Sequence, residues 1–198
     1  MAMVVAIVGS YRRGGITDQA VDAVLEGSRE HGAKTEKIYL IEQRIEFCRN
    51  CRMCCQIPGP ERGECVHQDD LELVLPKLED ASAVVLGSPV NYHNVTAVFR
   101  RFMERLLGYT YWPWGKNLGP VMRRKVRAKK AVLVASAAVP RFFIPLMTGA
   151  PRALKVAAKM VGARPVGKLW IGAVGSAPEE TLHSRVRAKA VRLGHKLA

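Results

Sequence analysis

The 198-residue sequence lacks any long hydrophobic run, internal repeat or low-complexity tract. Its longest apolar segments, such as residues 131–139, fall far short of the roughly 20 residues that a membrane-spanning helix needs. The first residues pass from an apolar run directly into a glycine-rich loop, with no basic region before the run. We therefore expect a first strand there, rather than a signal peptide, and a cytoplasmic protein.

The composition of the chain predicts a single folded domain. Apolar residues make up 48% of the chain and charged residues 24%, which excludes a disordered, collagen-like or coiled-coil protein. A chain of this length can bury a continuous core without disulfide or metal staples. We expect residues 1–198 to form one domain, with a cysteine-rich loop at 41–66 and a basic-aromatic insertion at 108–130.

Acidic residues are scarce in the second half of the chain. Residues 100–198 hold 21 Lys+Arg and 3 Asp+Glu, a net charge of +18, whereas residues 1–99 hold 10 and 14, a net charge of −4. A basic half of this kind suits an anionic membrane surface, an acidic redox partner, a phosphorylated cosubstrate or simply a solvated helix surface. Nucleic acid is not expected, because the chain shows no recognised nucleic-acid module.

Cysteine is absent outside residues 48–65. The five cysteines run Cys48-x2-Cys51-x2-Cys54-Cys55, followed by Cys65. A secreted disulfide framework spreads its cysteines along the chain, so this clustering indicates metal or redox chemistry. Three interpretations stay open: an iron-sulfur cluster on Cys48, Cys51, Cys54 and Cys65, a zinc ion, for which the spacing is poor, or thiols without a metal. Under the first, Cys55 is the spare thiol.

Strand-like and helix-like segments alternate along the chain. Apolar runs predict strands at residues 3–8, 34–40, 83–86, 131–135 and 166–173, and helical periodicity predicts helices over 18–31, 69–78, 95–107, 151–161 and 179–197. Five strands that alternate with five helices predict a parallel sheet covered on both faces.

A second long irregular stretch is the basic-aromatic insertion at residues 108–130. Its large side chains are Tyr109, Tyr111, Trp112, Trp114, Arg123, Arg124, Lys125, Arg127, Lys129 and Lys130. Together with residues 141–147, it predicts exposed apolar surface bordered by cations. We expect a homo-oligomer, most simply a dimer, with a lid over a bound cofactor or a peripheral contact with an anionic membrane as alternatives.

Two loops follow predicted strands at the sheet edge where proteins of this architecture bind ligands. The first, Gly9-Ser10-Tyr11-Arg12-Arg13-Gly14-Gly15-Ile16-Thr17, precedes a helix and offers hydroxyl groups and arginines to a phosphate. It is neither a Walker loop nor Gly-x-Gly-x-x-Gly, and a plain tight turn is the alternative. The second is Gly87-Ser88-Pro89-Val90-Asn91-Tyr92-His93-Asn94-Val95-Thr96.

These loops carry a resemblance to a known family. The second loop resembles the Gly-Ser-Pro-Val-Tyr-Phe-Gly-Asn-Val-Thr segment of the flavodoxin-like NAD(P)H-dependent FMN reductases, and the first is similar to their phosphate loop. The cysteine loop resembles that of the iron-sulfur flavoproteins in the same superfamily, where such a loop holds a [4Fe-4S] cluster. The resemblance implies an α/β, flavodoxin-like, doubly wound five-stranded parallel sheet of order 2-1-3-4-5 with helices on both faces.

The resemblance also implies a cofactor site. Ser10, Arg12, Gly15 and Thr17 would hold the FMN phosphate, with Ile16 where the family has Asn; Pro89, Val90, Asn91, Tyr92 and Asn94 would run beside the isoalloxazine ring, and Ser136 would flank it. Asn91 and His93 depart from the family pattern, and His93 is either a proton donor or a surface residue.

The implied activity is an oxidoreductase with no catalytic acid or base. It would take electrons from NAD(P)H or a reduced carrier and pass them to a small acceptor or redox protein. The alternative is an iron-sulfur flavoprotein electron-transfer module without a small-molecule substrate. Because the cysteine loop follows the second strand, we expect it at the same sheet edge as the flavin loops.

Overall fold

A parallel sheet forms the centre of the molecule. The computed structural model describes residues 1–117, 119–123 and 128–198, and its main strands lie in the order β2-β1-β3-β7-β8. Their bounds are β1 Met3–Val8, β2 Lys34–Tyr39, β3 Ala83–Asn91, β7 Lys129–Ser136 and β8 Ala163–Ile171. Numbered along the chain, this is the predicted order 2-1-3-4-5, and the predicted fold class is confirmed.

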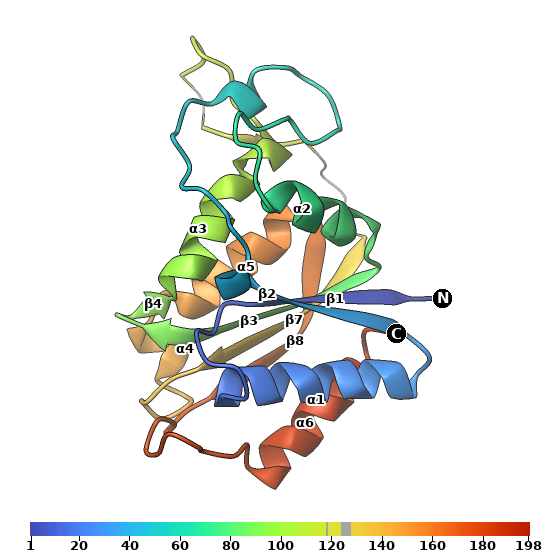
Figure 1. Ribbon diagram of the computed structural model, residues 1–198, viewed down its shortest axis with the longest axis vertical. Coiled ribbons are helices and arrows are strands. Elements are labelled where there is room, and N and C mark those ends of the chain that lie inside the picture. Colours follow the sequence, from blue (N-terminus) through green and yellow to red (C-terminus); the bar gives the residue numbers. More distant parts are fainter. Residues whose placement is uncertain (118, 124–127) are drawn as a thin grey trace.

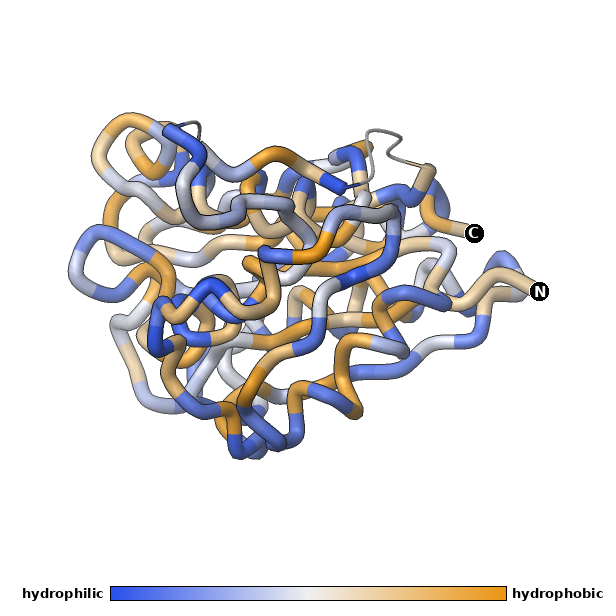
Figure 2. Tube along the Cα trace, turned by 90° about the horizontal axis from the view of Figure 1, so that it is seen from above, coloured by the Kyte–Doolittle hydropathy of each residue, from blue (hydrophilic) through white to orange (hydrophobic). Residues whose placement is uncertain are grey.

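Helices cover both faces of the sheet (Figure 1). Helices α1 (Ile16–Glu30) and α6 (Ser184–Gly194) pack on one face, and α2 (Leu71–Asp80), α3 (Ala97–Arg105) and α5 (Ala150–Met160) pack on the other. The central strands are apolar on both sides: Val5 and Ile7 of β1 join one core, whereas Val4 and Ala6 join the other. In Figure 2 the hydrophobic colour accordingly runs through interior segments.

Two glycines let α1 and α6 pack with their backbones in contact. A Cβ atom added to Gly27 would lie 2.1 Å from the carbonyl oxygen of Val191, and one added to Gly194 would lie 2.0 Å from that of Val24. The Ser28 hydroxyl bonds the Gly194 carbonyl oxygen at 3.1 Å. The C-terminal helix is thereby fixed against the first helix, and the loop that precedes α6 is held near the start of α1.

Short elements complete the fold. They are β4 (Asn94–Val95), β5 (Thr110–Tyr111), β6 (Val121–Met122), α4 (Ile144–Met147) and three single-turn 3₁₀ helices at Leu40–Glu42, Met53–Cys55 and Leu106–Tyr109. The last helix begins at Ser184, five residues later than predicted, because residues 172–183 form a loop against the first loop. Within the described residues, no helix has the length and apolar character to cross a membrane.

Candidate functional site

A cavity of about 330 Å³ opens at the carboxyl ends of the parallel strands. Its walls are residues 10–12, 15–17, 89–91 and 136–138, together with part of the loop at 174–180. The residues predicted for the flavin site all line this cavity except Tyr92 and Asn94. Residues 174–180 were missed by the sequence analysis, although their position after the last strand is a signal that could have found them.

The first loop ends at an open helix N-terminus. Gly15 is the N-cap of α1 and no side chain caps it, so the first amide groups of α1 are available to an anion. The hydroxyl oxygen of Ser10 accepts a hydrogen bond from the Arg12 amide at 3.1 Å and donates one to the Arg12 carbonyl at 3.0 Å. This bonding holds the turn in shape. The donor set fits the phosphate of a mononucleotide.

Two hydroxyl groups from distant parts of the chain meet on the cavity wall. The oxygen atoms of Thr17, in the first turn of α1, and Ser136, at the end of β7, lie 2.7 Å apart. Both residues are buried and both line the cavity. The structure thus brings together two residues, 119 positions apart, that were predicted for one site.

The two arginines of the first loop point to different partners. Arg12 donates to the carbonyl oxygen of Pro178 across the mouth of the cavity. Arg13 pairs with Glu42 and lies over the ring of Tyr39, 4.5 Å from its centroid, outside the cavity. Arg12 is therefore the loop arginine that can contact a ligand in the cavity.

A buried carboxylate that the sequence analysis missed supports the first loop. Asp18 accepts hydrogen bonds from the Gly14 amide at 2.8 Å, Lys37 at 2.9 Å and the Tyr39 hydroxyl at 3.0 Å. Burial alone would lower the pKa of Lys37, but its bonds to Asp22, Tyr39 and Asp18 outweigh burial and raise it. The ammonium group therefore stays charged and balances Asp18. An acidic residue in the first helical turn was the available signal.

The second loop forms a tight hairpin. Val90 and Asn91 at the end of β3 pair with Val95 and Asn94 of β4. The turn residues Tyr92 and His93 have φ values of 43° and 60°, and the Tyr92 side chain is fully exposed. His93 is also exposed, with its Nδ1 atom 3.3 Å from the Met147 carbonyl oxygen. The structure places His93 at the surface, and Tyr92 away from the cavity wall.

The cysteine loop lies at the opposite end of α3 from the second loop (Figure 1), which corrects the expectation of a common sheet edge. The Thr96 hydroxyl, at the start of α3, donates to the Gly9 carbonyl oxygen at 2.6 Å. The Cys55 thiol, beyond the end of α3, lies 3.4 Å from the Leu107 carbonyl oxygen. The nine residues of α3 span about 13 Å. The chain after β2 runs back along α3. A hydrogen bond of 2.9 Å from Arg105, at the end of α3, to the Glu46 carbonyl oxygen shows this path.

The Cys54 thiol lies within electrostatic reach of three other thiols, those of Cys55, Cys65 and Cys48. Burial and then the thiols of Cys55, Cys65 and Cys48 raise the pKa of Cys54 to about 12, and the Cys54 and Cys55 sulfur atoms lie 3.7 Å apart. Cys51, a predicted ligand, is exposed. Among the described residues, no three Cys, His, Asp or Glu side chains are arranged to hold a metal ion. Of the predicted cluster ligands, Cys48 and Cys65 lie near Cys54.

Arg123 fastens the cysteine loop to the insertion. Its guanidinium donates to the carbonyl oxygens of Cys54 at 3.0 Å and Ile57 at 2.8 Å, and also to those of Gly108 at 2.9 Å and Thr110 at 3.1 Å. No pattern in the sequence indicates this role, because Arg123 lies in a basic run and does not differ from its neighbours there. Leu118 and residues 124–127, which include the predicted Arg124, Lys125 and Arg127, lie outside the described residues.

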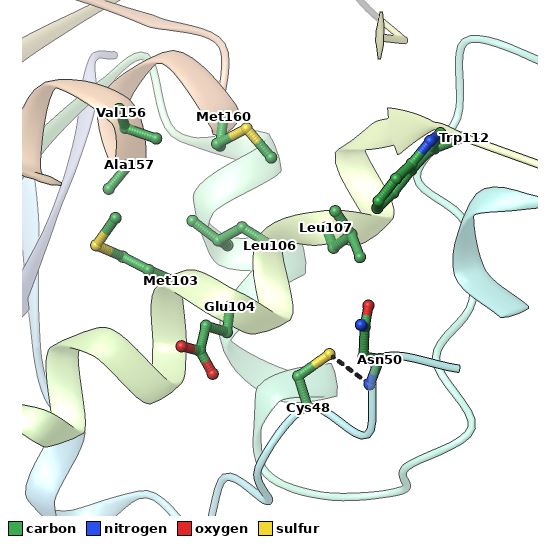
Figure 3. Close-up of a pocket in the computed structure, with 10 residues that line it drawn as sticks. All are labelled: Cys48, Asn50, Met103, Glu104, Leu106, Leu107, Trp112, Val156, Ala157 and Met160. Atoms are coloured by element: carbon green, nitrogen blue, oxygen red, sulfur yellow. Dashed lines mark hydrogen bonds between the residues drawn. The ribbon is translucent and has the colours of Figure 1, made fainter. Parts of the chain in front are cut away.

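A second cavity, of about 430 Å³, lies between α3, α5 and the cysteine loop (Figure 3). Figure 3 shows apolar side chains from both helices on one side of it and Cys48 and Asn50 on the other. The Cys48 sulfur accepts from the Asn50 amide at 3.4 Å. Cys48 is thus the thiol of the cysteine loop that lines this groove.

The aromatic residues of the insertion are partly packed. The Arg52 guanidinium lies 3.2 Å from the ring centroid of Trp112 and 4.3 Å from that of Trp114. Trp112 is half-buried, whereas Trp114 is exposed. Phe142 and Leu146 form exposed apolar surface elsewhere, near α4. Part of the predicted apolar surface is therefore used to hold the cysteine loop.

Comparison with known proteins gives a consistent result. Residues 2–142 match the family model described as NADPH-dependent FMN reductase. An iron-sulfur flavoprotein of Archaeoglobus fulgidus is 36% identical over 109 residues, which are 55% of this chain and 47% of that protein. One from Methanocaldococcus jannaschii is 35% identical over 102 residues, 52% of this chain and 50% of that protein. The chain spans about half the length of these curated relatives.

Solved structures share the fold over nearly the whole chain. An azoreductase from Bacillus anthracis superposes with a TM-score of 0.71 at 15% identity, covering 99% of this chain and 100% of that one. An NAD(P)H:quinone oxidoreductase from Methanothermobacter marburgensis gives 0.67 at 19% identity, covering 100% and 96%. At these identities the likeness concerns the fold alone.

Proposed function

Because this chain belongs to the NADPH-dependent FMN reductase family, we propose that it is an FMN-dependent oxidoreductase. It takes electrons from NAD(P)H or a reduced carrier and passes them to a small acceptor or redox protein. The observation that carries this proposal is the cavity at the carboxyl ends of the strands, where the uncapped N-terminus of α1 lies beside the paired Thr17 and Ser136 hydroxyls.

Different residues of the cavity contact different parts of FMN. Ser10, Gly15, Ile16 and Thr17 offer amide and hydroxyl donors to the phosphate, and Arg12 adds a charge-assisted contact. The segment Pro89–Val90–Asn91 and residues 136–138 flank the isoalloxazine ring from two strands. Asp18 holds the first loop in position through its bond from the Gly14 amide, and Lys37 in turn bonds Asp18.

The chemistry supplied by bound FMN is acceptance of a hydride and release of electrons to an acceptor; the protein orients the ring and tunes its potential. Tyr92 and Asn94 do not line the cavity as the hairpin stands. We assign them to the rim of the site, where Asn94 fixes the hairpin by accepting from the Val95 amide at 2.9 Å.

Purified protein tests the proposal directly. We expect resolved flavin absorption bands, stoichiometric FMN after acid release, and steady NAD(P)H oxidation when a quinone or free flavin is added. A colourless protein that neither retains nor rebinds FMN contradicts the proposal. FMN binding without turnover in the presence of these acceptors supports an electron-transfer module instead.

That module is the second candidate, with an iron-sulfur cluster on the cysteine loop as the partner of the flavin. It is supported by the names of the curated relatives and by the gathering of Cys48, Cys54 and Cys65. The cluster requires the exposed Cys51 to turn toward the other thiols. We further propose a cytoplasmic homo-oligomer, because clustered free thiols suit a reducing compartment and exposed Leu146 suits an interface.

A further inference from the structure

The carboxylate of Asp18 lies next to the first loop, outside the cavity at the carboxyl ends of the strands. Its side chain is 3% exposed, and it accepts a hydrogen bond of 2.8 Å from the Gly14 amide. The next residue, Gly15, lines the cavity and is the N-cap of α1. Asp18 and an anion in the cavity are therefore attracted by the same helix N-terminus, where they repel each other.

Lys37 supplies the charge that balances Asp18. Its Nζ atom reaches from the edge strand β2 to within 2.9 Å of the Asp18 carboxylate and 2.6 Å of that of Asp22. The Lys37 side chain is 20% exposed, so water and salt screen this interaction less than a surface pair. The Tyr39 hydroxyl also donates to Asp18, at 3.0 Å, but it carries no charge and cannot offset that of the carboxylate.

The two residues have separate roles at the first loop. Gly14 has a φ value of 70°, and the bond that Asp18 accepts from its amide helps to hold this turn. A hydrogen-bond acceptor is therefore needed at position 18, close to a site for an anion. A neutral acceptor would hold the turn equally well, whereas the negative charge of Asp18 needs the cation of Lys37 beside it.

We infer that Lys37 is a positioning residue for the flavin phosphate and that it acts through Asp18. The inference rests on the proposed function, since FMN supplies the anion. Lys37 is not among the described residues that line the cavity, so it has no contact with a flavin bound there. It offsets the charge of Asp18 instead. The site thereby prefers FMN to riboflavin, which has the same ring and no phosphate.

Flavin affinities of the purified protein at pH 8 test the inference. A phosphate monoester carries close to two negative charges at this pH. Lys37→Met should raise the dissociation constant for FMN at least tenfold and change that for riboflavin less than twofold, as measured by fluorescence quenching. The matched control is Lys34→Met, which removes an exposed lysine from the first position of the same strand and should leave both constants unchanged. An unchanged FMN constant, or equal losses for both flavins, overturns the inference.

A double-mutant cycle with FMN alone separates charge compensation from a structural role of Lys37. Asp18→Asn keeps an acceptor for the Gly14 amide and removes the charge. In that background, Lys37→Met should change the FMN dissociation constant less than twofold. The same loss with and without the Asp18 charge would show that Lys37 does not act through it, which overturns the inference. Lys37→Gln, with the same expected values, replaces Lys37→Met if that variant does not fold.

Failure of the proposed function and failure of the inference give different results. A wild-type protein that does not bind FMN contradicts the proposed function, and with it the inference. A wild type that binds FMN, together with a Lys37→Met variant that binds it as tightly, contradicts the role of Lys37 alone.

Discussion

Arg105, the last residue of α3, and Asp69, which precedes α2, form an ion pair at 2.6 Å with both side chains 1% exposed. The same guanidinium donates to the Glu46 carbonyl oxygen, so one buried cation joins α3, the start of α2 and the segment that leads to the cysteines. Arg105 therefore holds the cysteine loop at the far end of α3, although it does not line the cavity at the carboxyl ends of the strands.

We expect Asp69→Asn to destabilise the protein by about 3–5 kcal/mol at pH 7, because it leaves a buried guanidinium without its counter-charge. Burial would raise the pKa of Asp69, but bonds from Arg105 and the Glu46 amide outweigh burial and lower it. A lowered folded-state pKa means that the stabilisation is fully present above the unfolded value, about 3.9, and is lost as pH falls through the folded one.

The measurement is urea unfolding of wild type and variant between pH 7 and pH 3. The difference in unfolding free energy should shrink below about pH 4. Glu36→Gln, which breaks the more exposed pair with Lys77, is the control and should cost about 0–1 kcal/mol. A difference that stays constant with pH would show that the carboxylate charge is not responsible.

Removal of both Thr17 and Arg12 side chains should weaken FMN binding. We expect Arg12→Ala/Thr17→Ala to lose about 1.5–3 kcal/mol or more of binding free energy, the usual value of a charge-assisted hydrogen bond. Flavin fluorescence quenching measures the dissociation constant. Arg13→Ala is the matched control, since Arg13 lies in the same loop but pairs with Glu42. Unchanged FMN affinity in the double variant would show that the phosphate does not bind at this loop.

Iron content decides between the interpretations of the cysteine loop. If the loop binds a [4Fe-4S] cluster in anaerobically purified protein, Cys51→Ser should abolish the iron and Cys55→Ser should leave it intact. Cys55 bonds the Leu107 carbonyl oxygen from a buried position, a contact that serine can keep. Stoichiometric FMN without iron in the wild type would contradict the cluster and would leave the flavin reductase as the single proposed function.

Arg123 should control the exposure of the thiols. Loss of its bonds to the Cys54 and Ile57 carbonyl oxygens in Arg123→Ala frees the cysteine loop from the insertion. We expect labelling of the apoprotein thiols by a disulfide reagent to become at least tenfold faster, which corresponds to about 1.4 kcal/mol of lost loop stability. Arg152→Ala, at an exposed position of α5, should label like the wild type. Equal rates for both variants would show that Arg123 does not hold the loop closed.

The amino-acid pattern alone predicts the fold and most of the residues that line the cavity proposed for FMN. Apolar runs that alternate with helical segments predict a parallel sheet covered on both faces. The loops that follow β1, β3 and β7 meet at its carboxyl edge, as expected for this architecture. The resemblance of the two loops to the FMN reductases then placed Pro89 and Ser136 in the same site as Ser10 and Thr17, and all four residues line one cavity.

The position of the cysteines and the charges that support the two loops could be found only from the packed structure. A loop of 26 residues after β2 has no periodicity that fixes its path, and its course along α3 follows from the buried pair of Arg105 and Asp69. The roles of Arg123 and Asp18 likewise depend on partners that are distant in the sequence or belong to another element. Pairing between separate segments is a property of packing, and neither composition nor spacing records it.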